Sequence, residues 1–474
     1  MSAENEPVLV WFRRDFRVTD HPALAAACSA GGPVIPVFIL DDLAEDIGAA
    51  PKWRLGLGLE AFSARLEQIG GRLILRRGDA LTQLQRLIAE TGARAVYWSR
   101  LYDPGSKARD TVVKAALKEQ GVDAQSYPGH LLFEPWTVET KTGGFYKVYT
   151  PMWNAVKNRD VGTPLRPPSQ LPAPAAWPKS DQLADWALAA EMNRGARVVR
   201  PYVQLGEAAA RDRLDFFIAE GVNRYAELRD IPSVDGTSRL SENLALGEMS
   251  PRQCWAAGMH ARSEGKRGAE TFLKELVWRE FAYHLMHHTP HILSDNWKEG
   301  WDSFPWEVDE SADKAQAWRQ GRTGMPFVDA AMREMYVTGR MHNRGRMIVA
   351  SYLTKHLMCH WKIGLDWFRD CLIDWDPASN AMGWQWSSGS GPDATPYFRV
   401  FNPQTQLDKF DPKRAYVDHW IAEGRKTPTE AALSYFEAIP RHWNLTPDTP
   451  YPAPIVTAED GRKVALSAYE NRDF

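Results

Sequence analysis

VLVWF at residues 8–12 is the first of four short β-rich runs, and it is followed by VIPVFIL (34–40), LILRRG (73–78) and AVYWSR (95–100). Their length and apolar character are typical of strands that are buried on both faces of a sheet. Helix-like segments separate them, among them PALAAACSA (22–30) and LGLEAFSARLEQIG (57–70). Strands that alternate with helices favour parallel pairing through right-handed crossovers. Residues 1–135 are therefore predicted to form a doubly wound, Rossmann-like α/β domain.

These strands carry neither of the common nucleotide-binding signatures. No GxGxxG and no GxxxxGK[ST] follows any of the four runs, so the sequence predicts neither a dinucleotide fingerprint nor a P-loop. A ligand could still bind at the carboxyl ends of the strands, which is where open α/β sheets hold theirs.

The next part of the chain changes character. PLRPPSQLPAPAAWP (164–178) has six prolines in fifteen positions, a composition that excludes helix and central strand and predicts an extended connector. We expect residues 136–200 to form a long interdomain linker. From residue 201 to 474 the β-rich runs largely vanish, and apolar residues recur at helical spacing. The clearest examples are AETFLKELVWREFAYHLMHH (269–288), FVDAAMREMYVTG (327–339) and RMIVASYLTKHLMCHW (346–361). They predict an all-helical second domain.

Composition narrows the class of protein. The 474 residues are 44% hydrophobic, which is enough for two domains with cores of their own. The net charge of −3 argues weakly against nucleic-acid binding, although a local basic face can lie on an acidic body. The four cysteines show no zinc spacing, as expected of reduced thiols, and no apolar run approaches the roughly 18 residues of a membrane span. We expect a soluble cytoplasmic protein.

Two segments of the second domain have residues that could bind a phosphate and a nucleobase, respectively. DGTSRLSENLALGEMSPRQ (235–253) gathers hydroxyls and backbone N–H groups just before a helix-like run, where a phosphate could bind. An ordinary capped helix is the simpler interpretation. In KELVWREF (274–281), Glu275, Trp278 and Arg279 share one helical face and could pair and stack on a nucleobase. An amphipathic helix with an internal ion pair explains the same pattern.

Two further segments are basic or irregular. GRMHNRGRM (339–347) is a dense basic cluster that fits phosphate contacts, or equally a solvated surface. LIDWDPASNAMGWQWSSGSGPDATPYFR (372–399) combines acids, tryptophans and a Gly/Ser-rich tract, as loops that build sites do. The histidines of HLMHHTPH (284–291) lack the spacing of a metal site, and we predict none. Tryptophan is abundant: the chain has 20, and 12 of them lie between Trp255 and Trp420.

Together these segments resemble the photolyase/cryptochrome family, and within it the class I photolyases that act on cyclobutane pyrimidine dimers (CPDs). The resemblance is carried in order by VLVWFRRDFRVTDHPAL, GTSRLS, ELVWREF, GxPFVDAAMRE, MHNRGRM, WDPASN, GWQW and PYFRVFNP. It implies light-dependent DNA repair by a deoxyribodipyrimidine photo-lyase. It also implies an all-helical domain that binds a U-shaped FAD and an α/β domain that often holds an antenna chromophore. Either methenyltetrahydrofolate or 8-hydroxy-5-deazaflavin could be that antenna.

The resemblance also implies roles for individual residues of the cofactor site. Tyr225 and the run Thr237, Ser238, Arg239, Leu240 and Ser241 are expected to hold FAD, several of them around its phosphates. Asp374, Trp375 and Asp376 are expected to line its flavin and ribose side, with an Arg346–Asp374 ion pair against the isoalloxazine ring. Asn380 corresponds to the residue that faces flavin N5, where a neutral amide can hydrogen-bond the protonated N5 of reduced flavin.

The substrate side follows from the same motifs. Trp278, Met347 and Trp386 correspond to the apolar walls of a CPD pocket, and Glu275 to the carboxylate that hydrogen-bonds the flipped bases. The expected DNA contacts are Arg229, Arg279, Asn343, Arg344, Arg399 and Gln406. Trp384, Trp361 and Trp306 correspond to the electron-hopping triad, ordered from flavin to surface. Splitting the dimer requires an electron that side chains cannot supply, so the chemistry belongs to the cofactor.

Two alternatives stay open within the family. A cryptochrome would change the residue at the Asn380 position and often extend the C-terminus. A (6-4) photolyase would place further histidines near MHNRGRM, where His342 stands alone. Met382 departs from the family, because many relatives carry small residues there. We expect UV-damaged DNA to be the partner and the protein to act as a monomer without an obligate protein partner.

Overall fold

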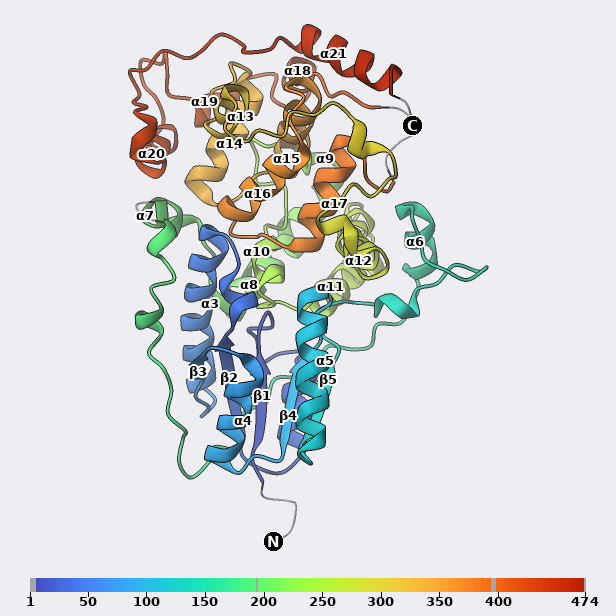
Figure 1. The fold of residues 1–474 in the computed structure, drawn as a ribbon, viewed down its shortest axis with the longest axis vertical. Coiled ribbons are helices and arrows are strands. Elements are labelled where there is room, and N and C mark those ends of the chain that lie inside the picture. The colour runs from blue at the N-terminus through green and yellow to red at the C-terminus, as the bar shows by residue number, and fades with distance from the viewer. Residues whose placement is uncertain (1–5, 193–194, 394–397, 473–474) are drawn as a thin grey trace.

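The predicted parallel sheet is present. In the computed structural model, which describes residues 6–192, 195–393 and 398–472, five parallel strands lie in the order β3-β2-β1-β4-β5 (Figure 1). They are β1 (Val8–Phe12), β2 (Val34–Leu40), β3 (Ile74–Arg77), β4 (Ala95–Ser99) and β5 (Asp123–Tyr127). The order reverses on either side of β1, as in a doubly wound fold.

The pleat of β1 explains why the sheet is covered on both faces. Val8, Val10 and Phe12 pack into one apolar cluster, and Leu9 and Trp11 pack into another, because successive side chains point to opposite faces. The first cluster includes residues of α1 (Pro22–Ser29) and α3 (Ala49–Glu67). The second includes residues of α4 (Ala80–Thr91) and α5 (Pro104–Glu119). The short helix α2 spans Asp42–Glu45.

The sequence prediction missed β5. Its residues, DAQSY, pair in parallel with β4 at the edge of the sheet, where Asp123 and Gln125 are exposed and Ala124 is buried. An edge strand needs only one apolar side chain in two, so a search for continuous apolar runs does not find it.

The segment between the two domains is extended but not free of structure. The proline-rich stretch 164–178 forms no helix or strand, as predicted, and it runs along the α/β domain. Leu171 is buried there, and the Val34 N–H donates to the Pro172 carbonyl over 2.7 Å. Helix α6 (Tyr149–Val156) precedes this stretch and packs on the helical domain. The limits 1–135, 136–200 and 201–474 remain a proposal.

The rest of the described chain is helical. The predicted helix at 269–288 is confirmed as α12 (Ala269–His288). The run 346–361 is not one regular helix: its first part belongs to an α-helix that ends at Ser351, and residues 352–356 form a π-helical turn. The other helices are α7 (Gly195–Val199), α8 (Gly206–Phe216), α9 (Tyr225–Leu228), α10 (Ser241–Ala245), α11 (Pro251–Ser263), α13 (Asp313–Arg319), α14 (Pro326–Thr338), α15 (Asn343–Ser351), α16 (Trp361–Cys371), α17 (Pro377–Ser388), α18 (Pro403–Phe410), α19 (Ala415–Trp420), α20 (Glu430–Ala438) and α21 (Ala458–Glu470).

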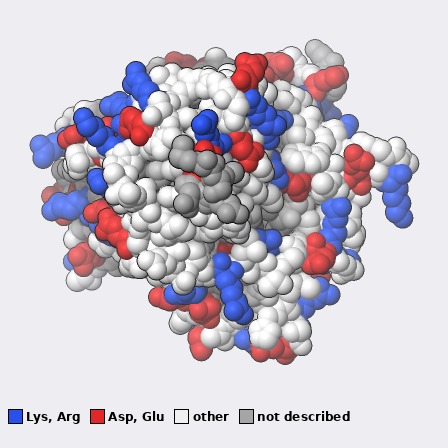
Figure 2. Space-filling view, turned by 90° about the horizontal axis from the view of Figure 1, so that it is seen from below, with Lys and Arg blue, Asp and Glu red and all other residues white. Residues whose placement is uncertain are grey.

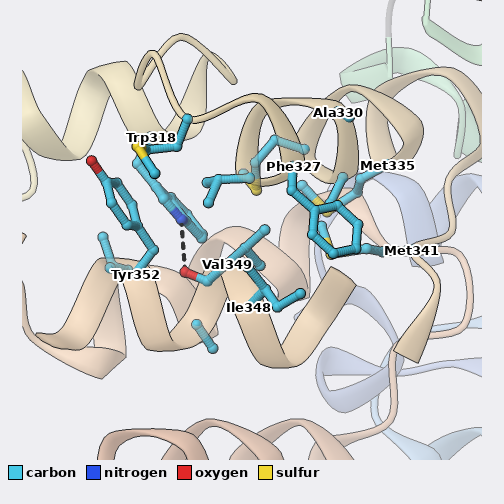
Figure 3. Close-up of a cluster of buried hydrophobic side chains, with 14 of the residues drawn as sticks. Trp318, Phe327, Ala330, Met335, Met341, Ile348, Val349 and Tyr352 are labelled. Atoms are coloured by element: carbon cyan, nitrogen blue, oxygen red, sulfur yellow. Dashed lines mark hydrogen bonds between the residues drawn. The ribbon is translucent and has the colours of Figure 1, made fainter. Parts of the chain in front are cut away.

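The core of this domain forms where α14 packs against α15. Phe327, Met335 and Ile348 are buried together there with Trp318 (Figure 3). The indole N–H of Trp318 donates to the Val349 carbonyl over 3.0 Å, so the largest side chain of the group buries no unpaired donor. Each of the large side chains contributes about 1.5–3 kcal/mol by leaving water.

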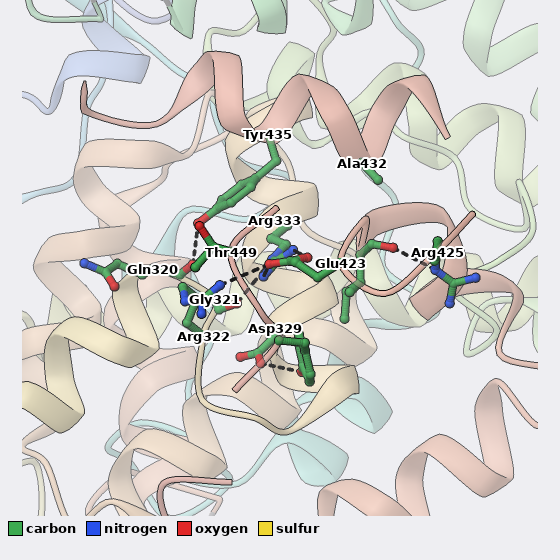
Figure 4. A network of polar contacts seen from close by, with 12 residues as sticks. Gln320, Gly321, Arg322, Asp329, Arg333, Glu423, Arg425, Ala432, Tyr435 and Thr449 are labelled. Carbon is green, nitrogen blue, oxygen red and sulfur yellow. Dashed lines mark hydrogen bonds and ion pairs between the residues drawn. The ribbon is translucent and has the colours of Figure 1, made fainter. Parts of the chain in front are cut away.

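A buried ion pair ties α14 to the segment after α19. The guanidinium of Arg333 donates to Glu423 over 2.5 and 2.8 Å, and Arg322 donates to the same carboxylate over 3.1 Å (Figure 4). Removing one partner would leave a buried charge, which costs about 3–5 kcal/mol. The network therefore fixes the C-terminal helices on the scaffold that carries the site.

Charge is mixed at the opposite end of the molecule. On the face of the α/β domain seen from below, cationic and anionic side chains are interspersed (Figure 2). An interspersed surface produces little long-range field, so this face does not have the character of a DNA-binding surface.

Candidate active site

The helical domain encloses a cavity of about 880 Å³. Its walls come from α9, α10, α12, α15, α16 and α17 and from the loop before α10. The structure brings most of the predicted site residues to this one cavity: Tyr225, Arg229, Thr237, Ser238, Arg239, Leu240, Ser241, Glu275, Trp278, Arg279, Asn343, Arg346, Met347, Asp374, Trp375, Asp376, Asn380, Trp384 and Trp386. The predicted residues that do not line it are Trp306, Trp361, Arg344, Arg399 and Gln406.

The loop before α10 is held open toward the cavity by an arginine from α8. Arg213 donates to the Ser238 carbonyl over 2.8 Å and forms an ion pair of 2.9 Å with Asp235. Arg239 pairs with the same carboxylate and has a left-handed backbone (φ 52°). These contacts fix the loop and leave the hydroxyls of its residues beside the start of α10, where an anion would be stabilised.

A buried charge network supports the same region from behind. Glu242 of α10 is fully buried and accepts from Arg54 of α3 over 3.1 Å and from Arg340, which lines the cavity. Burial lowers the pKa of Arg340 to about 10, despite the opposing effect of Asp374, and Arg239 and Arg54 add to the lowering. The sequence analysis placed Arg340 in a basic cluster but missed both Glu242 and Arg54, because they lie far from it in sequence.

The predicted ion pair between Arg346 and Asp374 is present. Arg346 donates to the two carboxylate oxygens over 2.9 and 2.8 Å and, through Nε, to the Met341 carbonyl over 2.9 Å. Asp374 is buried and Arg346 is partly exposed at the cavity. Both bonds to Asp374 come from the same nitrogen, Nη2, and together with the Nε bond they hold the guanidinium plane in one orientation.

Asp376 begins the helix that carries much of the site. It caps α17 by accepting from the Ser379 N–H over 2.9 Å, and it pairs with Arg14 of the α/β domain over 2.9 Å. The Tyr283 hydroxyl donates to the same carboxylate. Burial opposes ionisation of Asp376, but Arg14 and Arg279 outweigh it and hold its pKa below the usual value. Neither Arg14 nor Tyr283 was predicted, because both lie far from Asp376 in the sequence.

Asn380 is placed one turn into α17 with its amide already oriented. Its Nδ2 donates to the Leu365 carbonyl of α16 over 3.0 Å, and the side chain lines the cavity. That bond fixes the amide plane and leaves the Oδ1 atom as the acceptor for a donor in the cavity.

Another part of the cavity lining is largely apolar. Trp278, Met347 and Trp386 line it together with Glu275, whose carboxylate pairs with Arg229. Asn343 is exposed at the start of α15. Aromatic walls with few polar groups suit a ligand that is recognised by stacking and a small number of hydrogen bonds.

The predicted DNA-contacting arginines have different surroundings. Arg279 points inward, because it donates to the His130 carbonyl over 2.9 Å and pairs with Glu280 over 3.2 Å. Arg344 pairs with Asp230 over 2.7 Å and lies over the Phe410 ring. Arg399 is exposed and Gln406 is half-buried. The geometry favours a structural role for Arg279, and the DNA contacts of the whole group stay predictions.

The three predicted triad indoles lead away from the cavity. Trp384 lines it and has its ring centroid 4.9 Å from that of Phe368. Trp361 is fully buried on α16, and His360 lies between it and Trp306, with ring centroids 5.4 and 5.2 Å away. Trp306 is itself 7% exposed. Electron transfer along these rings stays a prediction.

Glu334, a partly buried acid in the cavity wall, was not among the predicted site residues. It accepts from the His342 N–H over 3.2 Å and from the Tyr416 hydroxyl. Burial raises the pKa of Glu334 to about 7, although the Tyr416 hydroxyl and the His342 N–H both stabilise the ionised form. One helical turn away on α14 lie Ala330, Ala331 and Val337, which are apolar core residues. The adjacent Arg333 is charged but pairs with Glu423, so no local pattern marks Glu334 as a site residue.

The donor set of the cavity fits an organic cofactor. Buried nitrogen atoms of lining residues have no hydrogen-bond partner within the described chain: Nε1 of Trp375 and Trp384, Nε of Arg340 and Nε2 of His342. The volume lies at the upper end of the range of about 300–1,000 Å³ for ligand pockets, as a dinucleotide requires. Within the residues that the structure describes, no group of three or more His, Cys, Asp and Glu side chains could hold a metal ion.

Comparison with known proteins identifies the family. The family described as "FAD binding domain of DNA photolyase" matches residues 272–471, which contain most of α12 and all of α13 to α21. The family described as "DNA photolyase" matches residues 8–175. The chain belongs to the photolyase/cryptochrome family. The predictions of an α/β domain followed by a helical FAD-binding domain, and of a deoxyribodipyrimidine photo-lyase that binds damaged DNA, are confirmed.

Individual photolyases and one cryptochrome are similar along almost the whole chain. A deoxyribodipyrimidine photo-lyase of Agrobacterium fabrum is 45% identical over 99% of this chain and 98% of its own. The crystal structure of a class III photolyase from Agrobacterium tumefaciens has a TM-score of 0.91 at 44% identity, covering 99% of this chain and 98% of that one. Cryptochrome-2 of Arabidopsis thaliana is 34% identical over 98% of this chain and 79% of its own. No helix among the described residues is both long and apolar enough to cross a membrane.

Proposed function

We propose that the cavity binds FAD and a flipped-out cyclobutane pyrimidine dimer side by side, and that light drives an electron from the one to the other. The observation that carries this proposal is the meeting of two unlike surfaces in one cavity. Arg346, Asp374 and Asn380 supply polar groups to the cavity lining, and Trp278, Met347 and Trp386 supply aromatic and apolar surface. We take the first group as the cofactor end and the second as the substrate end. A flipped base needs apolar walls and few polar anchors.

The cofactor end would be held by residues from three places in the chain. Hydroxyls and N–H groups of Thr237, Ser238 and Ser241 would bind the phosphates, and Tyr225, Arg239 and Leu240 would enclose them. Asp374, Trp375 and Asp376 would line the flavin and ribose, with Arg346 beside the ring system. When bound, FAD supplies the light absorption and the one-electron chemistry that the side chains lack.

Asn380 would stabilise the reduced cofactor through its amide. Its Nδ2 is committed to the Leu365 carbonyl, so Oδ1 is the atom that would accept from a protonated ring nitrogen. A neutral acceptor adds no charge to the site, whereas an acid at this position would introduce one.

At the substrate end, Glu275 would hydrogen-bond the flipped pyrimidines. It lies one helical turn before Trp278 on α12, so carboxylate and indole reach the same ligand. Arg229 pairs with Glu275 and would hold its carboxylate in one orientation until the bases arrive. Asn343, Arg344, Arg399 and Gln406 would contact the DNA around the lesion.

Trp384, Trp361 and Trp306 would reduce oxidised FAD in the light by passing an electron inward. Buried indoles can be oxidised transiently, and the His360 and Phe368 rings fill the space around them. This path serves photoreduction only, since repair itself starts from the reduced cofactor.

The finer assignments are proposals as well. We predicted class I, but the likeness to the class III structure supports class III more directly. A second chromophore, a folate or a deazaflavin, would be the antenna of the α/β domain. We keep the monomeric state, which the family resemblance implies, and the cytoplasmic location as expectations.

One assay tests the proposed function. Reduced protein is incubated with an oligonucleotide that carries one thymine dimer, and restored thymine is measured under blue light and in the dark. A (6-4) photoproduct oligonucleotide is treated in parallel. We expect light-dependent repair of the dimer only. Binding without repair in the light would favour the cryptochrome alternative, and repair of the second oligonucleotide alone would favour a (6-4) photolyase.

A further inference from the structure

The indole of Trp278 has a second aromatic ring stacked on its back. The Tyr149 ring lies parallel to it, with centroids 3.8 Å apart and an angle of 4° between the planes. Phe281 contacts the edges of both rings, at centroid distances of 5.8 and 6.0 Å. Trp278 lines the cavity, whereas Tyr149 is only 7% exposed. In this stacked pair the Tyr149 side is buried, and the free face of Trp278 is turned toward the substrate end.

Tyr149 is held independently of Trp278. Its hydroxyl donates to the Lys274 carbonyl over 2.7 Å, and Lys274 lies one turn before Trp278 on α12. The residues before it are fastened further along the same helix. Phe145 stacks on His288 with centroids 4.9 Å apart, and the Tyr146 N–H donates to His284 Nε2 over 3.0 Å. Helix α6, which Tyr149 begins, lies beside α12 (Figure 1).

We propose that Tyr149 is a positioning residue for substrate recognition, which fixes the plane of the Trp278 indole so that a flipped pyrimidine can stack on its other face. This inference rests on the proposed role of Trp278 as a wall of the dimer pocket. An indole on a helix surface can turn about two side-chain bonds, and stacking requires one orientation. A parallel ring behind it removes the other orientations before the substrate binds, which lowers the entropic cost of binding.

The stacking also gives a function to a segment that we had predicted to be only a linker. This segment passes beside α12, and its helix α6 supports the substrate end of the site. Trp278 and Glu275 are both on α12, so a displacement of α6 would affect the indole more than the carboxylate, which has its own partner in Arg229.

The test compares three variants with the wild type. Tyr149→Leu removes the ring, Tyr149→Phe keeps the ring and removes the hydroxyl, and Trp153→Leu is the matched control. Trp153 lies on the same helix and is also buried, but it packs under Lys274 Nζ at 5.6 Å. Affinity is measured in the dark for one oligonucleotide with and without a thymine dimer, and the ratio of the two is the readout.

We expect Tyr149→Leu to lower this ratio by about tenfold, because the stabilisation from one aromatic pair corresponds to at most about a tenfold change in affinity. Tyr149→Phe keeps the ratio within about twofold of the wild type, since the stack remains. Trp153→Leu lowers the melting temperature and leaves the ratio unchanged. Should Tyr149→Leu fail to fold, Tyr149→Met keeps the apolar volume without a ring and carries the same expectation.

Three results would overturn the inference. A ratio unchanged in Tyr149→Leu and Tyr149→Met would show that the ring behind Trp278 does not matter for recognition. Additive effects of Tyr149→Leu and Trp278→Leu in the double variant would show that the two residues act independently, because residues that work through one contact are not additive. If Trp278→Leu alone leaves the ratio unchanged, the proposed pocket wall fails together with this inference.

Discussion

Gly364 of α16 lies so close to Trp384 of α17 that a Cβ atom at position 364 would overlap the six-membered part of the indole. The absence of a side chain there lets the two helices approach, and it lets Trp384 pack between Phe368 and Trp318 at the cavity. The position of the indole at the cavity therefore depends on a glycine in the neighbouring helix.

Gly364→Ala is expected to displace Trp384. Overpacking of this kind costs about 1–3 kcal/mol in stability, and the shifted indole would reduce both FAD retention and the rate of photoreduction several-fold. Bound FAD per chain and the rate of absorbance change under blue light are the measurements. Gly56→Ala on α3 is the control, because a Cβ there meets only Leu188 at an ordinary 3.4 Å. Unchanged photoreduction in Gly364→Ala would mean that Trp384 is not the first carrier.

Asn380→Asp is expected to destabilise the reduced cofactor. A carboxylate would replace a neutral acceptor in a partly buried site, and a reduced, electron-rich ring beside it is disfavoured. A tenfold change corresponds to about 59 mV for one electron, and we expect a fall in midpoint potential of at least that size. Redox titration measures it. Asn380→Gln keeps the amide and is expected to shift the potential less; equal shifts would contradict the proposed role of the charge.

Trp306→Phe separates two functions of the protein. The indole of Trp306 lies beyond His360 and outside the cavity, so it is expected to affect photoreduction without affecting repair. Photoreduction of oxidised protein should slow at least tenfold, whereas chemically prereduced protein should repair at the wild-type rate. Equal loss of both activities would indicate that Trp306 only supports the fold.

Glu334 gives a pH dependence of stability whose sign follows from its raised pKa. The folded protein binds its proton up to about pH 7, whereas the unfolded chain releases it near 4.5. Between these values the folded state holds more protons, so the free energy of unfolding falls as the pH rises, by about 3 kcal/mol. Glu334→Gln should flatten this part of the profile. Urea unfolding at about pH 5 and pH 8 compares the two proteins, and parallel profiles would contradict the assignment.

Arg399 and Arg344 should contribute differently to DNA binding. Arg399 is exposed, whereas Arg344 pairs with Asp230 over 2.7 Å. Each phosphate contact adds about 1 to the slope of log affinity against log salt. Arg399→Ala is therefore expected to lower the slope by about 1, and Arg344→Ala by less, because Asp230 already neutralises part of its charge. A slope unchanged in both variants would remove these residues from the DNA interface.

The sequence predicted most of what depends on local patterns. Four strands, helix α12 and the proline-rich stretch follow from apolar periodicity and from proline chemistry. Strand β5 was missed because an edge strand does not need a continuous apolar run. The site residues came from motifs, and their gathering in one cavity could not be read from composition or periodicity.

The sequence could not predict pairs of residues that are distant along the chain and come into contact only in the folded protein. Arg14 and Tyr283 reach Asp376, and Arg54 reaches Glu242, across long stretches of chain. The stacking of Tyr149 on Trp278 belongs to the same group. No local pattern marks such pairs, because the geometry of domain packing creates them.

The ion pair between Arg14 and Asp376 has a consequence for how this protein could be rebuilt. Asp376 begins α17, so the guanidinium that follows β1 helps to set the start of the helix that carries Asn380, Trp384 and Trp386. The α/β domain is thus a structural part of the site, whether or not it carries a chromophore. A chimera that joins the helical half of this chain to the α/β half of a relative would need to keep an arginine at position 14. Without it, the buried Asp376 carboxylate would keep the Tyr283 hydroxyl but would lose its ion pair.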